Sequence, residues 1–364
     1  MQSKQTFTKL LEAVIVAVSL SADIHAIPTH ALDSQLDVRQ VWQNETNHNS
    51  SEAVNILPRV NTVNVPLQAY QIEGQDAYYV AGFRGHRPGY HAGQSTSFQN
   101  LHQAWQIQYA DGSRASGDVA RDRVRIGNMA MAGFPIGMAD TLTGNLRTSR
   151  DSGVAGFANG RRAATRTGGP AVLDALRDTG YIELSMVGIK LGRGAHGAAG
   201  TGRLTLGGYD ATLFHGGNDM VTVHNTHAGG LWQVTLPSIR VGGTTVAHGT
   251  GILDTGAARI TTSPHDAEAV HARIPGAAYT QGVFGLPCNT HAVVSFRIGN
   301  IRWGVNSRDL VGPAINNQGT VCLSQIQALG NKPVGTWTLG IPFLKNVYQI
   351  LDSDNNDISL ARLA

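Results

Sequence analysis

Short runs of alternating apolar and polar residues cover most of the chain after about residue 60. RVRIGN, GRLTLGGYD and WQVTLPSIRVGG alternate in this way and end at glycine-containing turns. A period of two is typical of strands with one buried face. No apolar run reaches the roughly 18 residues of a membrane-spanning helix, and no heptad pattern is sustained. The pattern predicts an all-β protein.

Two segments depart from the strand pattern and predict short helices. In GPAVLDALRDTG, Leu173 and Leu176 share one helical face, and Gly180 provides the C-terminal stop. In SPHDAEAVHARI, Ser263 can cap the helix and Pro264 occupies its first turn.

The first 62 residues follow a different pattern. Residues 1–26 contain two lysines, an apolar stretch and then small residues, which is the layout of a signal peptide, although Glu12 interrupts the apolar stretch. An ordinary short hydrophobic helix is the alternative. Residues 27–62 are polar and predict a propeptide or flexible leader. Asn44 and Asn49 begin Asn-x-Ser/Thr glycosylation sequons, so we expect a secreted, extracellular glycoprotein.

Composition narrows the class further. The 44 glycines among 364 residues suit a chain with many tight turns. The net charge of +3 comes from dispersed arginines rather than a basic run, so we expect no nucleic-acid partner and no membrane anchor. The chain is long enough for two lobes, each with its own core.

Two cysteines, Cys288 and Cys322, are present. As a disulfide they would close a modest loop and contribute roughly 3–4 kcal/mol through chain entropy. Two unpaired buried thiols are the alternative if the protein is not secreted.

The stretch GILDTGAARI carries the most informative carboxylate. Asp254 follows apolar residues, and a carboxylate in such a place is costly to bury unless it is paired or hydrogen-bonded. The same tripeptide begins at Asp178, at the end of a predicted helix, where a surface carboxylate is expected. These ten residues alone favour a structural turn, so the context must decide.

Other motifs indicate no further chemistry. Gly192, Gly194 and Gly197 match GxGxxG, but a strand follows them instead of a helix, which favours a hairpin loop. The 14 histidines lie in no HExxH or Cys/His framework. We therefore expect no metal and no cofactor.

The second half of the chain resembles the pepsin-like aspartic peptidases, particularly the secreted fungal kind. LWQVTLPSIRVGG resembles the strand pair before the second catalytic motif, GILDTGAARITTSP resembles that motif, and LPCNTHAVVSFRIGNIRW resembles the disulfide-bearing sheet. WTLGIPFLKNVYQILDSDNNDISLA is similar to the closing segment, whose apolar-apolar-Gly step packs beside the catalytic turn; Thr338 departs from that step. The resemblance implies a bilobal fold, a disulfide between the two cysteines, Asp254 as a catalytic group, and Thr255 and Gly256 as its support.

The first half resembles the family in part. WQIQYADGSRASGDVARDRVRIGN is similar to the flap hairpin, which makes Tyr109 the flap tyrosine over bound peptide and places Asp111 at the tip. SGVAGFANG resembles the inner strand of the N-terminal lobe, with Gly156 in its apolar-apolar-Gly step. The resemblance implies a truncated N-terminal lobe over residues 63–180 and a C-terminal lobe over residues 181–364.

The first catalytic Asp-Thr/Ser-Gly motif of the family is missing before the flap. The interval YQIEGQDAYYVAGFRGHRPGYHAGQSTSFQ contains only Glu73 and Asp76 as carboxylates, and neither ends a strand at a glycine turn. The family's chemistry needs two carboxylates that share a proton and a water, and general acid–base help is worth roughly 10²–10⁴-fold per group. Ala257 also stands where the family often has Ser or Thr.

We therefore expect an endopeptidase by family whose activity is impaired or lost in this chain, so that whether it acts as an enzyme stays open. The chain could be damaged, or its sequence could lack a segment because of an incorrect gene model or alternative splicing. It could instead be a secreted peptide-binding pseudopeptidase. Two further alternatives are an unrelated β-sandwich binding module and a symmetric dimer that supplies Asp254 twice. The expected state is a monomer that meets a peptide or protein substrate.

Overall fold

The computed structural model describes nine ranges of the chain: 63–72, 75–80, 92–109, 112–126, 129–147, 153–162, 167–193, 201–280 and 282–364. In the first two ranges it describes the backbone alone. The expected signal peptide (1–26), the leader (27–62) and the sequons at Asn44 and Asn49 lie outside these ranges. So do Glu73 and Asp111.

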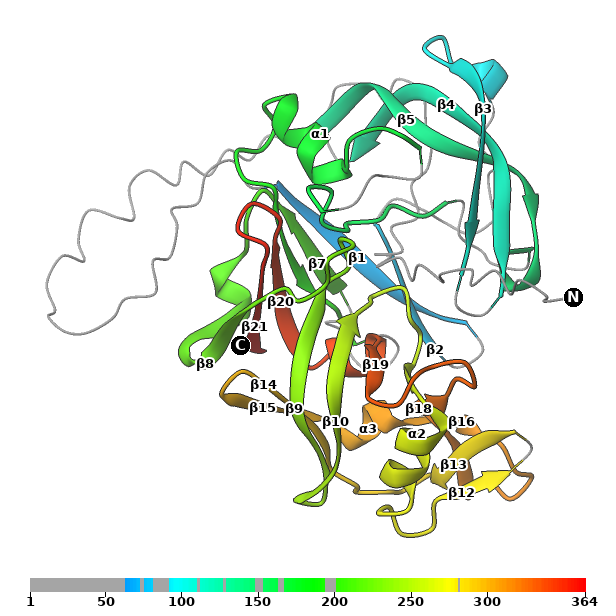
Figure 1. The fold of residues 1–364 in the computed structure, drawn as a ribbon, viewed down its shortest axis with the longest axis vertical. Helices are drawn as coiled ribbons and strands as arrows, with labels where there is room; N and C mark the ends of the chain where they lie inside the picture. Colours follow the sequence, from blue (N-terminus) through cyan, green and yellow to red (C-terminus); the bar gives the residue numbers. More distant parts are fainter. Residues whose placement is uncertain are drawn as a thin grey trace, which may run out of the picture.

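The described chain is built mainly from strands, which confirms the all-β prediction (Figure 1). A seven-stranded antiparallel sheet combines strands from both ends of the chain. Its order is β2 (Gln75–Val80), β1 (Val63–Ile72), β7 (Thr201–Leu206), β6 (Met186–Lys190), β20 (Val347–Asp352), β21 (Asp357–Leu363) and β8 (Phe214–His224).

A second seven-stranded sheet contains parallel as well as antiparallel pairs. Its order is β15 (Ile301–Val305), β14 (Val294–Ile298), β9 (Gln233–Val241), β10 (Thr244–Leu253), β19 (Thr336–Leu339), β11 (Ile260–Thr262) and β18 (Ile326–Ala328). β10 pairs with β19 in parallel, and β11 pairs with β18 in parallel. Parallel neighbours require long connections, so the centre of this sheet is assembled from distant parts of the sequence.

Two smaller sheets complete the described strands. One has the order β12 (Ala278–Thr280), β13 (Val283–Pro287), β17 (Val321–Ser324) and β16 (Val311–Ala314). It carries the Cys288–Cys322 disulfide, with an S–S distance of 2.09 Å, which confirms the predicted pairing. The other is β3 (Gln99–Gln108), β4 (Arg114–Ile126) and β5 (Met129–Leu142).

The helices are short, and both predicted ones are present. α1 (Val172–Asp178) is followed by Gly180 with φ +76°, and α2 (Pro264–His271) is capped by the Ser263 hydroxyl, which accepts from Asp266 N at 3.1 Å. The other helical turns in the described ranges are α3 (Ser307–Leu310), α4 (Ile341–Leu344), η2 (Ala92–Gln94), η3 (Gly144–Arg147) and η4 (Ala211–Leu213).

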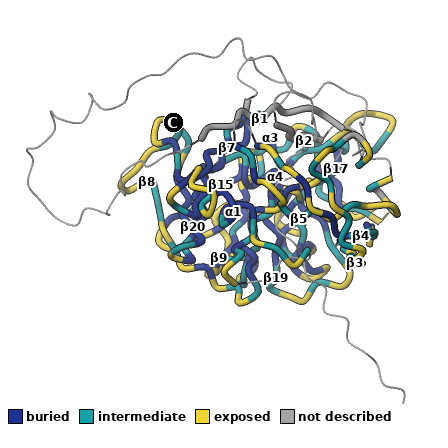
Figure 2. The backbone as a smooth tube through the Cα atoms, turned by 90° about the horizontal axis from the view of Figure 1, so that it is seen from above, coloured by how far each residue is buried: buried dark blue, intermediate teal, exposed yellow. Residues whose placement is uncertain are grey.

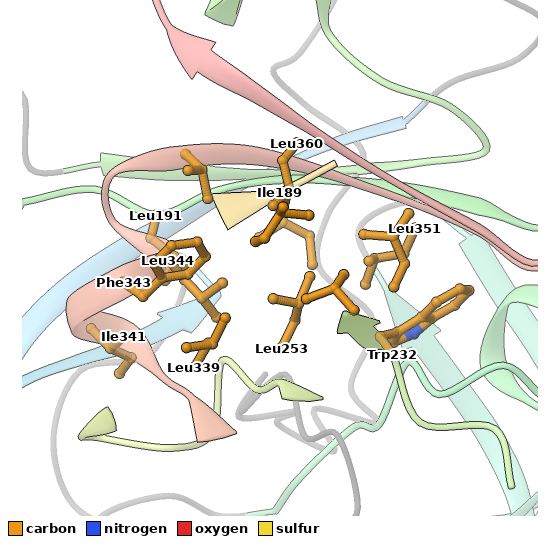
Figure 3. Packing of buried hydrophobic residues seen from close by; sticks show 14 of the residues in the cluster. Ile189, Leu191, Trp232, Leu253, Leu339, Ile341, Phe343, Leu344, Leu351 and Leu360 are labelled. Carbon is orange, nitrogen blue, oxygen red and sulfur yellow. The ribbon is translucent and has the colours of Figure 1, made fainter. Parts of the chain in front are cut away.

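A large hydrophobic core lies between the two seven-stranded sheets and extends to α1. In Figure 2 the buried positions lie mainly in the interior of the described part of the molecule, and many exposed positions lie in its outer loops. Figure 3 shows Leu253, Leu339 and Leu344 packed together with Leu360 and Trp232 in this core. The strand that leads to Asp254 is therefore fixed by packing on its apolar side.

The three-stranded sheet is less well covered. β4 places Val119, Ala120 and Ile126 in the interior, whereas none of the ten residues of β3 is buried. β3 also forms an edge of its sheet in the described part of the chain.

Candidate active site

Asp254 comes directly after β10, at the point where the strand leaves the core. Leu253, the last residue of the strand, is 1% exposed, and its N–H donates to Trp232 O at 2.9 Å. Asp254 N donates to Leu339 O at 3.1 Å, which continues the parallel pairing of β10 with β19 by one residue. The packed strand therefore presents the half-buried Asp254 side chain from a rigid base.

The DTG tripeptide forms a tight turn around the carboxylate. Gly256 N donates to Asp254 Oδ1 at 2.8 Å, and Ala257 N donates to Asp254 O at 3.2 Å. Thr255 is buried at 7% exposure, whereas Gly256 is exposed. A backbone N–H donated to a carboxylate stabilises its charged form and holds its orientation.

α4 closes the turn from the other side. Ile341 N donates to Ala257 O at 2.8 Å. A Cβ on Gly340 would lie 2.3 Å from the carbonyl oxygens of both Ala257 and Arg259. Only glycine allows this approach, so the closing segment packs against the Asp254 turn as the family resemblance implies.

Thr338, the departure from an apolar step, has a specific polar contact. Its side chain is buried, and its hydroxyl accepts a hydrogen bond from Lys332 Nζ. The amine also lies 3.5 Å from Thr261 O on β11, the strand that pairs with β19 at this point. A buried hydroxyl needs such a partner, and Lys332 supplies it.

The second DTG tripeptide has the surface position that the sequence predicts. Asp178 is the last residue of α1 and is exposed. Thr179 Oγ1 donates to Ala175 O at 3.0 Å, and Gly180 N donates to Arg177 O at 2.8 Å. Here the tripeptide ends a helix, and its glycine takes the left-handed conformation common at helix C-termini.

The predicted flap is a hairpin of β3 and β4. Tyr109 lies at its turn, where Tyr109 N donates to Ser113 O at 2.9 Å and Gly112 N donates to Tyr109 O at 3.0 Å. The Tyr109 side chain is half-buried. Asp111, the predicted tip residue, is outside the described ranges.

Trp105 stabilises this hairpin in a way that the sequence did not reveal. Its indole Nε1 donates to Met138 O on β5 at 3.2 Å, so the ring spans the sheet from β3 to β5. A Cβ on Gly137 would meet the ring at 2.5 Å, and Gly117 pairs directly with Trp105. A large residue opposite two glycines is the signal that could have identified this contact.

The segment predicted as the inner strand of the N-terminal lobe contacts the base of the Asp254 turn. Trp232 Nε1 donates to Phe157 O at 2.8 Å, and Asn159 N donates to Gly230 O at 2.9 Å. Only Ala155 makes a β-bridge, so within residues 153–162 the expectation of a strand is wrong. The backbone finds these partners in a loop and an indole instead of a neighbouring strand.

The sequence also contains an Asp-Ser-Gly tripeptide at positions 151–153. It follows the flap hairpin, whereas the family's first catalytic motif precedes it. Asp151 and Ser152 lie outside the described ranges, and Gly153 leads into the Ala155–Phe157 segment.

Within the described ranges, no cluster of three or more His, Cys, Asp or Glu side chains has the arrangement of a metal site. In the same ranges, no helix is long and apolar enough to cross a membrane.

The eukaryotic aspartyl protease family matches residues 78–363 of the sequence. The chain belongs to this family. It is 32% identical over 298 residues to aspartic-type endopeptidase ctsD of Aspergillus fumigatus, covering 79% of this chain and 59% of that protein. It is 30% identical to rhizopuspepsin-1 of Rhizopus niveus over 275 residues, covering 74% of this chain and 67% of that protein.

A mammalian protein is also similar to the chain over a comparable length. Cathepsin E of Mus musculus is 28% identical over 283 residues, covering 75% of this chain and 69% of that protein. The first fungal relatives are longer than the matched part: the chain spans about half to two thirds of their length. Family membership confirms the pepsin-like, all-β fold.

Proposed function

We propose that this chain is a pepsin-like aspartic-type endopeptidase by descent that retains one of the two catalytic carboxylates, Asp254, and is impaired or inactive as a peptidase. The observation that carries the proposal is the turn at residues 254–257. Its carboxylate is oriented by Gly256 N, its backbone is held by Leu339, and α4 closes against it through Gly340.

The chemistry of the family explains why one carboxylate is insufficient. One carboxylate takes a proton from the attacking water while the other protonates the peptide carbonyl oxygen. Two such groups close together cannot both ionise, which divides the acid and base roles between them. Asp254 would fill one role, with Thr255 and Gly256 as its support.

The flap hairpin supplies the proposed substrate contact. Tyr109 and Asp111 would close over an extended peptide, in the manner that the family resemblance implies. The disulfide, together with the predicted signal peptide and sequons, supports secretion of the protein, whose proposed state is a monomer.

Peptidase assays at acid pH test the proposal. We expect no pepstatin-sensitive cleavage of an unfolded protein by the chain as it stands, and no difference between it and Asp254→Asn. Measurable cleavage that Asp254→Asn abolishes would show that the chain is active and that a second carboxylate exists. An Asp151→Asn variant, which alters the Asp-Ser-Gly tripeptide at 151–153, then identifies or excludes Asp151 as that group.

Sequencing the mature transcript between the codons for Asn61 and Asp122 tests the missing segment. An extra in-frame segment that encodes an apolar strand and Asp-Thr/Ser-Gly would assign an ordinary acid endopeptidase to the gene. A transcript that encodes the present sequence would show that the first catalytic Asp-Thr/Ser-Gly segment is absent from the protein.

A non-catalytic peptide-binding protein is the second candidate. It is favoured by the retention of both the flap turn at Tyr109 and the Asp254 turn. Calorimetric titration with pepstatin distinguishes the candidates: a binder without turnover shows saturable heat that Tyr109→Ala weakens. Absence of both heat and turnover would argue against a preserved cleft.

A further inference from the structure

Three arginines that are distant in the sequence come together on one face of the second seven-stranded sheet. We name Arg240 of β9, Arg297 of β14 and Arg302 of β15 the arginine cluster. Arg297 and Arg302 are direct cross-strand partners, and Arg240 pairs with Ser295, two residues before Arg297 on β14. Their strand neighbours Ile239, Phe296 and Trp303 are buried, so the arginines occupy the opposite, outer face.

No carboxylate compensates these charges within the described residues. Arg240 Nε donates to Thr245 Oγ1 at 3.1 Å, Arg297 Nε donates to Gly299 O at 3.3 Å, and Arg302 Nη2 donates to Ser238 Oγ at 3.0 Å. All these acceptors are neutral. Like charges directly opposite each other in a sheet are destabilising, so the cluster is electrostatically unfavourable by itself.

Arg302 is the most constrained member. Its Nη1 atom is buried and has no hydrogen-bond partner among the residues that the structure describes. Partial burial lowers the pKa of its guanidinium, and the neighbouring charges of Arg240 and Arg297 lower that pKa further. An unsatisfied guanidinium N–H costs free energy, and an anionic oxygen is the strongest acceptor for a guanidinium in a positive environment.

The space around the cluster suits a compact ligand. Ser238, Ser295 and Gly304 are the neighbours of the three arginines on the outer face of β9, β14 and β15. All three are small and neutral. A Cβ on Gly304 would meet nothing within 4 Å. Guanidinium groups donate in a planar fork that matches the oxygens of phosphate and sulfate.

We propose that the arginine cluster is a binding site for a tetrahedral oxyanion, a phosphate or sulfate group, held between three strands of the sheet. The oxyanion accepts from guanidinium groups of the cluster and offsets their mutual repulsion. The site lies on residues that the proposed peptidase chemistry does not use.

Thermal unfolding of the full chain with inorganic phosphate tests the site, with chloride keeping the ionic strength constant. We expect a saturable rise in Tm of about 2 °C at a tenfold excess over Kd. Arg302→Gln and, separately, Arg240→Gln should weaken the apparent affinity by tenfold or more. Arg273→Gln, which removes an exposed arginine that follows α2 and lies outside the cluster, should leave the phosphate response unchanged.

Two outcomes would overturn the proposal. One is an equal effect of phosphate and chloride at matched ionic strength; the other is a phosphate response that both cluster variants retain. A parallel titration with glucose 6-phosphate distinguishes the source of the group. Tighter binding of the ester identifies a phosphate carried on a larger molecule, and equal or weaker binding identifies the free ion.

Discussion

At the scale of single residues, Gly340 controls the geometry of the Asp254 turn. It lies between β19 and α4, where the backbone passes two carbonyl oxygens too closely for any side chain. Its φ of −84° is accessible to every residue, so backbone conformation does not require glycine here. Glycine is required because a Cβ would collide with these oxygens. The turn would have to move to accept even alanine.

We expect Gly340→Ala to lower the free energy of unfolding by about 1–3 kcal/mol or more, because the new methyl group displaces backbone in a packed region. Urea denaturation measures this change. Gly304→Ala is the matched control, because it adds the same methyl group to a glycine of β15 where nothing lies within 4 Å. It should change the free energy of unfolding by less than about 1 kcal/mol. Equal effects of the two substitutions would contradict the contact argument.

The two DTG tripeptides show what a single sequence can predict at this scale. The apolar residues before Asp254 and the helical pattern before Asp178 were sufficient to assign one to a strand end and the other to a helix end. The bonds from Leu339 and Ile341 could not be predicted without the family resemblance, because nothing local to Asp254 indicates which distant strand lies beside it.

At the scale of elements, α2 is attached to the disulfide-bearing sheet through His271. The buried ring places Nδ1 2.7 Å from Ala267 O and Nε2 2.8 Å from Ser324 Oγ on β17. It also stacks on Phe284 of β13, with the ring centroids 4.1 Å apart. Burial lowers the pKa of His271 to about 4, although the bond to Ala267 O partly opposes this shift.

This shift makes stability depend on pH. Between the ordinary histidine pKa of about 6.5 and the folded value of about 4, the unfolded chain binds a proton that the folded chain does not. The contribution of His271 is therefore complete above this window. It falls by about 3 kcal/mol as the pH drops through it, with no further loss below pH 4.

Replacing His271 by Gln removes this titration. The stability difference between the original chain and His271→Gln should shrink as the pH falls from 6.5 to 4, as measured by denaturant unfolding at each pH. The ring resonances of His271 should also remain those of a neutral imidazole until the pH approaches 4. A constant difference, or ring protonation near pH 6.5, would contradict the expected shift.

Elements differed in how far the sequence could define them. α1 and α2 were predictable because capping residues and helical periodicity are local signals. The flap hairpin was predictable from its polar turn between alternating runs. The irregular path of residues 153–162 was not, because its conformation follows from contacts with Gly230 and Trp232 that come much later in the chain.

At the scale of the whole molecule, Asn356 connects three separate parts of the chain. Its Oδ1 accepts from Asn159 Nδ2 at 2.8 Å and from Asn225 Nδ2 at 3.1 Å. Its Nδ2 donates to Asn225 O at 3.1 Å. Asn356 is buried and has a φ of +58°, a conformation that asparagine tolerates better than most residues. The predicted N-terminal lobe is thus joined to the β20–β21 turn.

We expect Asn356→Ala to lower the free energy of unfolding by about 2–4 kcal/mol, because it removes the acceptor shared by the buried Asn159 and Asn225 amides and adds backbone strain. Thermal or urea unfolding provides the measurement. Asn355→Ala, one residue earlier in the same turn, removes an exposed side chain that donates to Asp352 Oδ2 and should cost about 1 kcal/mol or less. A cost for Asn356→Ala no larger than that of the control would refute the linking role.

The distribution of charged side chains over the surface was the hardest property to predict from the sequence. The sequence shows dispersed arginines, and only the register of β9, β14 and β15 brings Arg240, Arg297 and Arg302 onto one surface. Cross-strand register depends on pairings across the sheet, which a pattern of apolar and polar positions does not define.

The parallel pairing of β10 with β19 has a consequence for how the protein is made. During synthesis Asp254 emerges long before Leu339 and Ile341, so for that interval the nascent turn lacks the backbone partners that fix it. The chain must hold β10 without its parallel neighbour until β19 and α4 have left the ribosome. Such late, non-local closure is slow and exposes strand edges to aggregation, which makes assembly of the Asp254 turn a natural point of dependence on chaperones.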